Sequence, residues 1–213
     1  MERNTDYDII INGGGMVGAA LACALGDSGY RVALLEGRRP PSLSALDREV
    51  DLRVSAISRA SQRIFQALGA WEEMAARRVS PYREMQVWDA SGPGYIHFDA
   101  ADLGEPQLGW IIENRLIQAA LWARAEAFDN IQLLCPAQLE WLAVEDDRVR
   151  LRLGSGRYLS SRLLVGADGA RSRTRILTGI AAGGWGYHQQ AVVAVVATER
   201  SHRETAWQRF LPT

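Results

Sequence analysis

The stretch YDIIINGGGMVGAALACALGDSGYRVALLEG, residues 7–37, decides the fold of this chain. A β-rich run, YDIIIN, leads into GGGMVG, an Ala-rich segment that is helical in pattern over about residues 16–28, and a second apolar run, RVALLE. A strand, a glycine-rich turn, a helix and another strand are the unit with which doubly wound parallel sheets begin. The stretch therefore predicts an α/β, Rossmann-like fold.

The glycines have the spacing G-x-G-x-x-G, at Gly13, Gly15 and Gly18. In such a motif the first glycine permits the tight turn, the second lets the backbone approach a pyrophosphate, and the third lets the helix lie close to the strand. Met16 and Val17 would then supply free amides at the helix N-terminus, where phosphates bind. The alternative is a glycine-rich turn with a purely structural use.

Glu36 ends the second expected strand, eighteen residues after Gly18. This is close to the spacing of about 20 residues at which an acidic side chain binds the ribose of a bound adenosine. A carboxylate at this place disfavours a 2′-phosphate and hence NADP, which leaves FAD or NAD. The alternative is an exposed carboxylate at a strand end.

Composition excludes several classes of function. The chain has 213 residues, 47% hydrophobic and 23% charged, and its formal net charge of −1 predicts no nucleic-acid partner. Cys23 and Cys135 form no C-x-x-C pair and are typical of reduced cysteines in a cytoplasmic protein. No apolar run reaches the ~20 residues of a membrane helix. His97, His188 and His202 lack ligand spacing, so we expect no metal.

Beyond residue 37, the pattern predicts two helices, a hairpin and a meander. The helices are expected over residues 58–68, capped by Gly69, and over residues 114–128. The hairpin is expected over residues 83–99, around the turn SGPG. Strands at 138–144, 148–153 and 158–165 predict an antiparallel meander, and residues 191–198 predict a further strand.

A second motif, VGADGARSRTR at residues 165–175, follows the last meander strand. Asp168, Gly169, Ser172 and Arg175 resemble the D-G-x-x-S-x-x-R motif of single-component (class A) flavoprotein aromatic hydroxylases, although an Asp-Gly after a strand is often only a turn. Together with the first motif it favours FAD over NAD, and an NAD-dependent dehydrogenase is disfavoured.

Five further segments restrict the resemblance to one group of these flavoproteins: DLRVSAISRASQRIFQALGAW, YREMQVWD, IIENRLIQAALW, LLVGADGARS and TAWQRFLPT. They are similar to the ubiquinone-biosynthesis hydroxylases, the 2-polyprenylphenol hydroxylase group. This implies a glutathione-reductase-type FAD-binding domain with a β-meander, at residues 1–80 and 100–183. It also implies part of an antiparallel substrate-domain sheet, at residues 81–99 and 184–213.

The resemblance also assigns roles to individual residues. Gly13, Gly15 and Gly18 would line the FAD pyrophosphate, and Glu36 would bind the adenosine ribose. Arg53 would reach the FAD phosphates, or be a surface arginine. Asn114 would lie over the flavin ribityl region, or be a plain helix N-cap. Asp168 would contact FAD, while Ser172 and Arg175 would brace that loop or help NAD(P)H to dock.

The activity implied by the resemblance is aromatic hydroxylation of a polyprenylphenol in ubiquinone biosynthesis. NAD(P)H would act as a transient reductant, and O2 would react through a flavin C4a-hydroperoxide. Partners in a ubiquinone-biosynthesis complex and peripheral contact with the inner membrane are also implied. Family members are about twice as long, so we expect the chain to be an N-terminal half and inactive by itself. Alternatives are a tailoring hydroxylase, a prenyl reductase, or a non-catalytic scaffold on the same fold.

Overall fold

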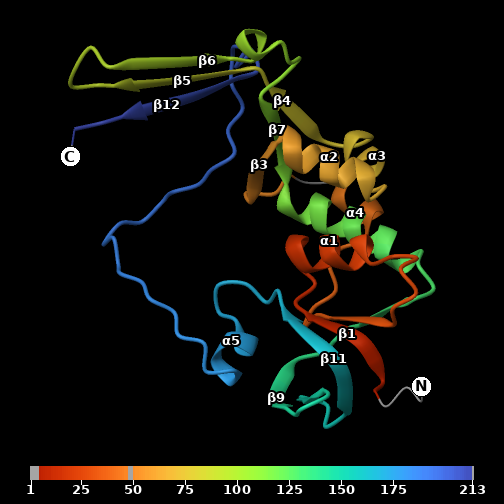
Figure 1. Cartoon of the computed structure of the whole chain (residues 1–213). Coiled ribbons are helices and arrows are strands. Elements are labelled where there is room, and N and C mark those ends of the chain that lie inside the picture. The colour runs from red at the N-terminus through yellow and green to blue at the C-terminus, as the bar shows by residue number, and fades with distance from the viewer. Residues whose placement is uncertain (1–4, 48–49, 213) are drawn as a thin grey trace. The chain divides into compact units, whose positions relative to one another are not determined.

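The computed structural model describes residues 5–47 and 50–212 and has a mixed α/β fold (Figure 1). It divides into two compact units, one of Met1–Ala45 and Ile117–Ala191, the other of Leu46–Leu116 and Val192–Thr213. The α/β expectation is therefore confirmed. Residues 1–4, 48–49 and 213 belong to the expected domain ranges but lie outside the described residues.

The first unit contains a six-stranded sheet in the order β8-β2-β1-β11-β10-β9. The strands that pair in parallel around β1 are β8 (Ile131–Leu134), β2 (Val32–Leu35), β1 (Tyr7–Asn12) and β11 (Tyr158–Gly166). β10 (Val149–Leu153) and β9 (Leu139–Val144) continue the sheet in antiparallel fashion, as the expected meander. The four residues of β2, VALL, are all buried, which explains why the parallel strands read as continuous apolar runs.

Two helices of this unit are tied to each other by a thiol. α1 (Met16–Ala24) connects β1 to β2, and α4 (Asn114–Glu126) precedes β8. Cys23 Sγ donates a hydrogen bond to the carbonyl oxygen of Leu121 at 3.2 Å. Burial raises the pKa of the Cys23 thiol to about 11, so this cysteine stays protonated and acts as a packing residue.

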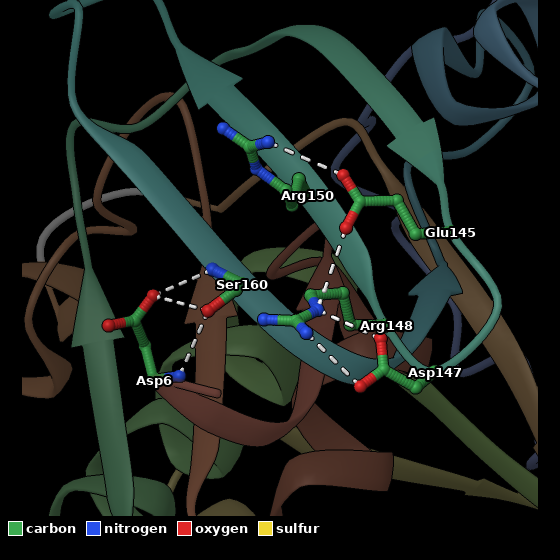
Figure 2. Close-up of polar contacts among 6 residues, drawn as sticks. All are labelled: Asp6, Glu145, Asp147, Arg148, Arg150 and Ser160. Carbon is green, nitrogen blue, oxygen red and sulfur yellow. Dashed lines mark hydrogen bonds and ion pairs between the residues drawn. The ribbon is translucent and has the colours of Figure 1, made fainter. Parts of the chain in front are cut away.

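Exposed polar contacts hold the outer part of the meander (Figure 2). Arg148 Nε lies 2.9 Å from Asp147 Oδ1 and 3.5 Å from Glu145 Oε2, in the turn between β9 and β10. The carboxylate of Asp6 accepts hydrogen bonds from the Ser160 backbone N–H at 2.7 Å and from its hydroxyl at 2.8 Å. Water screens the exposed ion pairs of Arg148, so they fix the turn more than they stabilise the fold.

The second unit contains two three-stranded sheets. In one, β7 (Gly109–Glu113) lies between β3 (Val54–Ser58) and β4 (Val79–Tyr82). α2 (Arg59–Ala67) and α3 (Trp71–Ala75) follow β3, and α2 is N-capped by Ser58 Oγ, which accepts from Ser61 N–H. Gly69 follows α2 with φ +70°, which confirms the expected glycine stop.

The other sheet has the order β12-β5-β6. β5 (Glu84–Asp89) and β6 (Tyr95–Asp99) form the expected antiparallel hairpin, whereas β12 (Thr205–Phe210) joins β5 in parallel. Short elements complete the chain: the 3-10 helices η1 (Leu43–Asp47) and η2 (Ala100–Leu103), and the helix α5 (Arg173–Leu177). No helix of the described residues is long and apolar enough to cross a membrane.

The strand expected at residues 191–198 is wrong for this structure. These residues form no strand, and the side chain of Val192 is 96% exposed. The run AVVAVVAT has high β-propensity, but a strand exists only when a neighbour completes its hydrogen-bond ladder. No other strand of the described residues pairs with this run.

We predict that Gly18→Ala will destabilise the fold. A Cβ at this position would lie 1.9 Å from the carbonyl oxygen of Gly13 and 3.1 Å from Ala167 Cβ. The free energy of unfolding should fall by about 2–3 kcal/mol, although alanine has the higher helix propensity. Urea unfolding measures the effect. Gly92→Ala is the control, because its Cβ would meet no atom within 4 Å. Equal stability of both variants would contradict the prediction.

Candidate functional site

A cavity of about 720 Å³ lies at the carboxyl ends of the parallel strands in the first unit. In doubly wound sheets, this edge is where ligands bind. The lining residues end or follow β1, β2 and β11, belong to β9 and the segment before it, or begin α5. They are Asn12, Gly13, Gly15, Leu35, Glu36, Gly37, Ala137, Gln138, Leu139, Glu140, Ala167, Asp168, Gly169, Arg171 and Arg173. The cavity therefore joins the two motifs singled out from the sequence.

Each of the three glycines in the first motif is a glycine for a different structural reason. Gly13 has φ +110°, and a Cβ there would lie 2.5 Å from the carbonyl oxygen of Ala167. Gly15 is the N-cap of α1, and a Cβ there would meet open space. Gly18 packs against the Gly13 carbonyl. Two glycines are thus required by packing, and Gly15 lies at the cavity as a ligand-facing residue would.

The first turn of α1 begins at this loop. Met16 is half-buried and Val17 is 75% exposed, and their side chains do not line the cavity. The backbone amides of a first helical turn have no intrahelical acceptor. The nine-residue α1 therefore presents free N–H groups and a partial positive charge at its start.

Glu36 directly follows β2 and lines the cavity. One carboxylate oxygen, Oε2, accepts a hydrogen bond from Gly14 N–H at 2.8 Å. The other, Oε1, accepts from Arg38 N–H at 3.2 Å. The carboxylate is thus fixed by backbone donors, and its remaining acceptor capacity is available to a ligand hydroxyl.

Asp168 also lines the cavity, but its carboxylate is engaged within the protein. Oδ1 accepts from the Ser172 hydroxyl at 2.6 Å. Oδ2 accepts from Thr174 N–H at 2.9 Å and from the amide of Asn12 at 3.1 Å. Burial opposes ionisation, but the hydrogen bonds from Ser172 and Thr174 outweigh it and hold the pKa of Asp168 below its usual value. The motif thus fastens the loop after β11 to the end of β1.

The other expected residues lie elsewhere. Arg175 donates to the carbonyl oxygen of Ala170 at 2.8 Å, so it braces the same loop. Arg53 and Asn114 lie in the second unit, where Asn114 N–H donates to the Arg53 carbonyl oxygen at 2.9 Å. Asn114 Oδ1 accepts from the Ser55 hydroxyl at 2.6 Å. The structure therefore brings Arg53 and Asn114 together, and the glycines, Glu36 and Asp168 together in the other unit.

Sequence reasoning missed Gly14, Gln118 and Trp122. The carbonyl oxygen of Gly14 accepts from Gln118 Nε2 and from Trp122 Nε1, both at 2.7 Å. The two donors lie four residues apart on α4, as neighbours on one helical face do. The only sequence signal was that spacing in NRLIQAALW, which does not show what the face contacts.

The second unit holds a group of possible metal ligands, Glu84, His97 and Asp99, whose ligand atoms lie within 4.8 Å of one another. His97 Nε2 is 3.0 Å from Glu84 Oε2. Asp99 Oδ1 accepts from Ala101 N–H at 2.8 Å, as the N-cap of η2. These contacts account for the group as cross-strand and capping interactions on a half-exposed hairpin.

The chemistry of the cavity is that of a binding site. The described residues that line it offer backbone amides, the three carboxylates of Glu36, Glu140 and Asp168, and the arginines Arg171 and Arg173, but no histidine or cysteine. Amides, arginines and a helix N-terminus suit phosphates, and a fixed carboxylate suits sugar hydroxyls. The residues present therefore fit a dinucleotide.

Comparison with known proteins agrees with this geometry. The family model "FAD binding domain" matches residues 6–211. The chain is 38% identical over 209 residues to the 3-demethoxyubiquinol 3-hydroxylase of Escherichia coli (strain K12), covering 98% of this chain and 53% of that protein. It is 38% identical over 221 residues to the mitochondrial ubiquinone biosynthesis monooxygenase COQ6 of Rattus norvegicus, covering 97% and 46%.

Among solved structures, the fold is similar to that of pqsL, a probable FAD-dependent monooxygenase from Pseudomonas aeruginosa. The TM-score is 0.68 and the identity is 25%, over 85% of this chain and 48% of that one. The chain thus spans about half the length of the curated relatives it matches.

We predict that the hydrogen bonds to the Asp168 carboxylate make the free energy of unfolding depend on pH. Because its pKa in the folded chain is lower than the ordinary ~3.9, its contribution is complete above about pH 3.9 and is lost as the pH falls through the folded value. Wild type should therefore exceed Asp168→Asn in unfolding free energy most at about pH 7. The difference should shrink at about pH 3, as chemical denaturation at each pH would show.

Ser172→Ala provides the companion measurement, because it removes the shortest hydrogen bond to Asp168 without removing the carboxylate. Its pH dependence should lie between those of the wild type and Asp168→Asn. If wild type and Asp168→Asn differed in unfolding free energy by the same amount at both pH values, the stabilising role of the ionised Asp168 carboxylate would be contradicted.

Proposed function

Because the chain belongs to the FAD binding domain family, we propose that it forms the nucleotide-binding part of a hydroxylase in ubiquinone biosynthesis. The observation that carries the proposal is the cavity at the end of β1, which joins the glycine loop, Glu36 and the Asp168 loop in one unit. FAD is the cofactor of this family. Bound there, it would supply the redox and oxygen-transfer chemistry that amino-acid side chains lack.

The pyrophosphate of FAD would lie at the start of α1. Gly13, Gly15 and Gly18 allow the close approach, and the amides of Met16 and Val17 are the donors that a helix N-terminus offers. Arg171 and Arg173 line the same cavity and add positive charge. This proposal is supported by the open space in front of Gly15.

Glu36 would accept hydrogen bonds from the adenosine ribose. Its carboxylate is positioned by Gly14 N–H, so little reorganisation is needed when the sugar arrives. A 2′-phosphate would bring negative charge against this carboxylate, which is why we propose FAD rather than NADP in this cavity.

Asp168 would act on FAD through its loop. Since its carboxylate is engaged by Asn12, Ser172 and Thr174, the neighbouring cavity backbone at Gly169 is the part of the motif left to face the cofactor. The roles of Arg53 at the FAD phosphates and of Asn114 at the ribityl chain remain part of the proposal. Both residues belong to the second unit.

The substrate proposal follows from the names of the two relatives, a 3-demethoxyubiquinol 3-hydroxylase and a ubiquinone biosynthesis monooxygenase. We propose that the whole protein hydroxylates a polyprenylphenol with O2 and NAD(P)H. The hairpin sheet, within residues 81–99 and 184–213, would begin the substrate-binding domain, and residues 1–80 and 100–183 would bind FAD. A prenylated substrate is the reason to propose a cytoplasmic protein in peripheral contact with the inner membrane and with other enzymes of the pathway.

We predict that Glu36→Gln will weaken FAD binding about tenfold, because hydrogen bonds to a charged acceptor are stronger than those to a neutral one. Quenching of flavin fluorescence on titration measures the dissociation constant. Glu126→Gln, an exposed carboxylate on α4 in the same unit, removes the same charge and should leave FAD affinity unchanged. Equal affinity of wild type and Glu36→Gln would refute the ribose contact.

The activity is tested on the purified protein with whatever sequence its gene encodes beyond residue 213. With NAD(P)H and isotopically labelled O2, we expect one labelled oxygen atom on the ring of a polyprenylphenol, detected by mass spectrometry. A small soluble phenol is the comparison substrate. Labelling of the small phenol alone would indicate a tailoring hydroxylase, and FAD binding without labelling of either would refute the hydroxylase proposal while leaving the cofactor site intact.

A further inference from the structure

The peptide unit between Gly14 and Gly15 is held by side chains from a distant helix. Gln118 Nε2 and Trp122 Nε1 each donate to the Gly14 carbonyl oxygen at 2.7 Å. Gln118 is half-buried and Trp122 is 2% exposed. Two donors thus satisfy both lone pairs of a buried carbonyl, in surroundings where losing either bond is costly.

This arrangement fixes the direction of the next amide. In a trans peptide, the C=O of one residue and the N–H of the following residue point in opposite directions. With the Gly14 carbonyl directed at α4, the Gly15 N–H points away from α4. Gly15 lines the cavity, and its N–H has no acceptor among the residues that the structure describes.

The loop needs such a constraint because of its sequence. Gly13, Gly14 and Gly15 are three consecutive glycines, and a glycine run has the largest backbone freedom of any sequence. Rotation of the Gly14–Gly15 peptide would turn its carbonyl oxygen, a partial negative charge, toward the place where a phosphate binds. Without the contacts to α4, the loss of backbone entropy in this loop would occur on ligand binding and would weaken it.

The middle glycine is explained by the same contact. A Cβ on Gly14 would lie 2.7 Å from Trp122 Cζ2 and 2.9 Å from Glu36 Cβ. The Trp122 ring therefore occupies the place of a side chain. Gly14 N–H in turn donates to Glu36, so both polar groups of Gly14 have fixed partners.

We propose that Gln118 and Trp122 are positioning residues that hold the Gly14–Gly15 peptide so that the Gly15 amide is presented to the pyrophosphate of the nucleotide. The proposal rests on the proposed FAD site and adds to it a pair of α4 residues that never touch the cofactor. Its consequence is specific: the pair contributes to binding of the phosphates and not to binding of the adenosine.

The test compares ADP with adenosine by isothermal titration calorimetry on wild type, Gln118→Met and Trp122→Phe. Each variant removes one donor: Gln118→Met keeps a similar side-chain volume, and Trp122→Phe keeps an aromatic ring but is smaller. We expect each to weaken ADP binding roughly three- to tenfold, the size of one lost hydrogen bond, and to change adenosine binding less than twofold. The affinity for FAD should fall by about the same factor as the affinity for ADP.

The matched control is Gln62→Met in the second unit. Gln62 is a buried glutamine whose Oε1 accepts from Trp110 Nε1 at 3.0 Å, so the variant also breaks a glutamine–tryptophan hydrogen bond. It should lower thermal stability without changing the ratio of ADP to adenosine affinity. An unchanged ADP affinity in Gln118→Met and Trp122→Phe would overturn the proposal, as would equal losses for ADP and adenosine.

A ligand-free measurement separates this proposal from the FAD assignment. In 15N NMR spectra, the Gly14 and Gly15 amide resonances should be single in wild type and shifted with line broadening or doubling in Gln118→Met, as expected for a peptide that rotates. If wild type bound no nucleotide, the FAD site would be wrong even with the NMR result as expected. If the spectra of all variants matched wild type, the positioning role would be wrong even with FAD bound.

Discussion

The close contact between Gly18 and the carbonyl oxygen of Gly13 is the constraint on which the rest of the nucleotide-binding unit depends. It sets how near α1 lies to the end of β1, and therefore where the free amides of the first helical turn lie. A side chain at Gly18 would move the helix away, and the loop between the two elements would lose its tight turn. Gly13 is confined in the same way from the other side, by the backbone of Ala167. The cavity exists because three backbone segments come this close without side chains between them.

Much of this was predictable from residues that act locally. The glycine turn, the strand directly before Glu36 and the strands of the meander come from short-range patterns, and each lies where the sequence predicts it. Gly69 was predictable for the same reason, since a helix stop depends on one residue's conformation. By contrast, the run at residues 191–198 has strong β-propensity and still forms no strand, because a ladder needs a partner that propensity does not supply.

Contacts between distant segments were the part that sequence could not give. Nothing local indicates that the Asp168 carboxylate turns inward to Asn12, 156 residues away, or that Gln118 reaches Gly14 across 104 residues. In both cases the residue type fits several roles: an aspartate can bind a ligand or a loop, and a glutamine on a helix can face water or a neighbour. The structure therefore separates two kinds of residue in the site. Some face the cavity, and others, such as Gln118, hold the backbone of the first kind in place.

The order of the strands has a consequence for how the protein is made. The glycine loop is translated at the start of the chain, but the backbone that closes it, at Ala167, comes near the end of the unit: Ala167 N–H donates to the Asn12 carbonyl oxygen at 2.8 Å, and β11 pairs with β1. A nascent chain that has left the ribosome only through α4 has the glycine loop and its α4 partners but not the far wall of the cavity. The cavity is thus incomplete until the meander has emerged, and until then the edge of β1 that pairs with β11 stays open, when chaperone protection matters most.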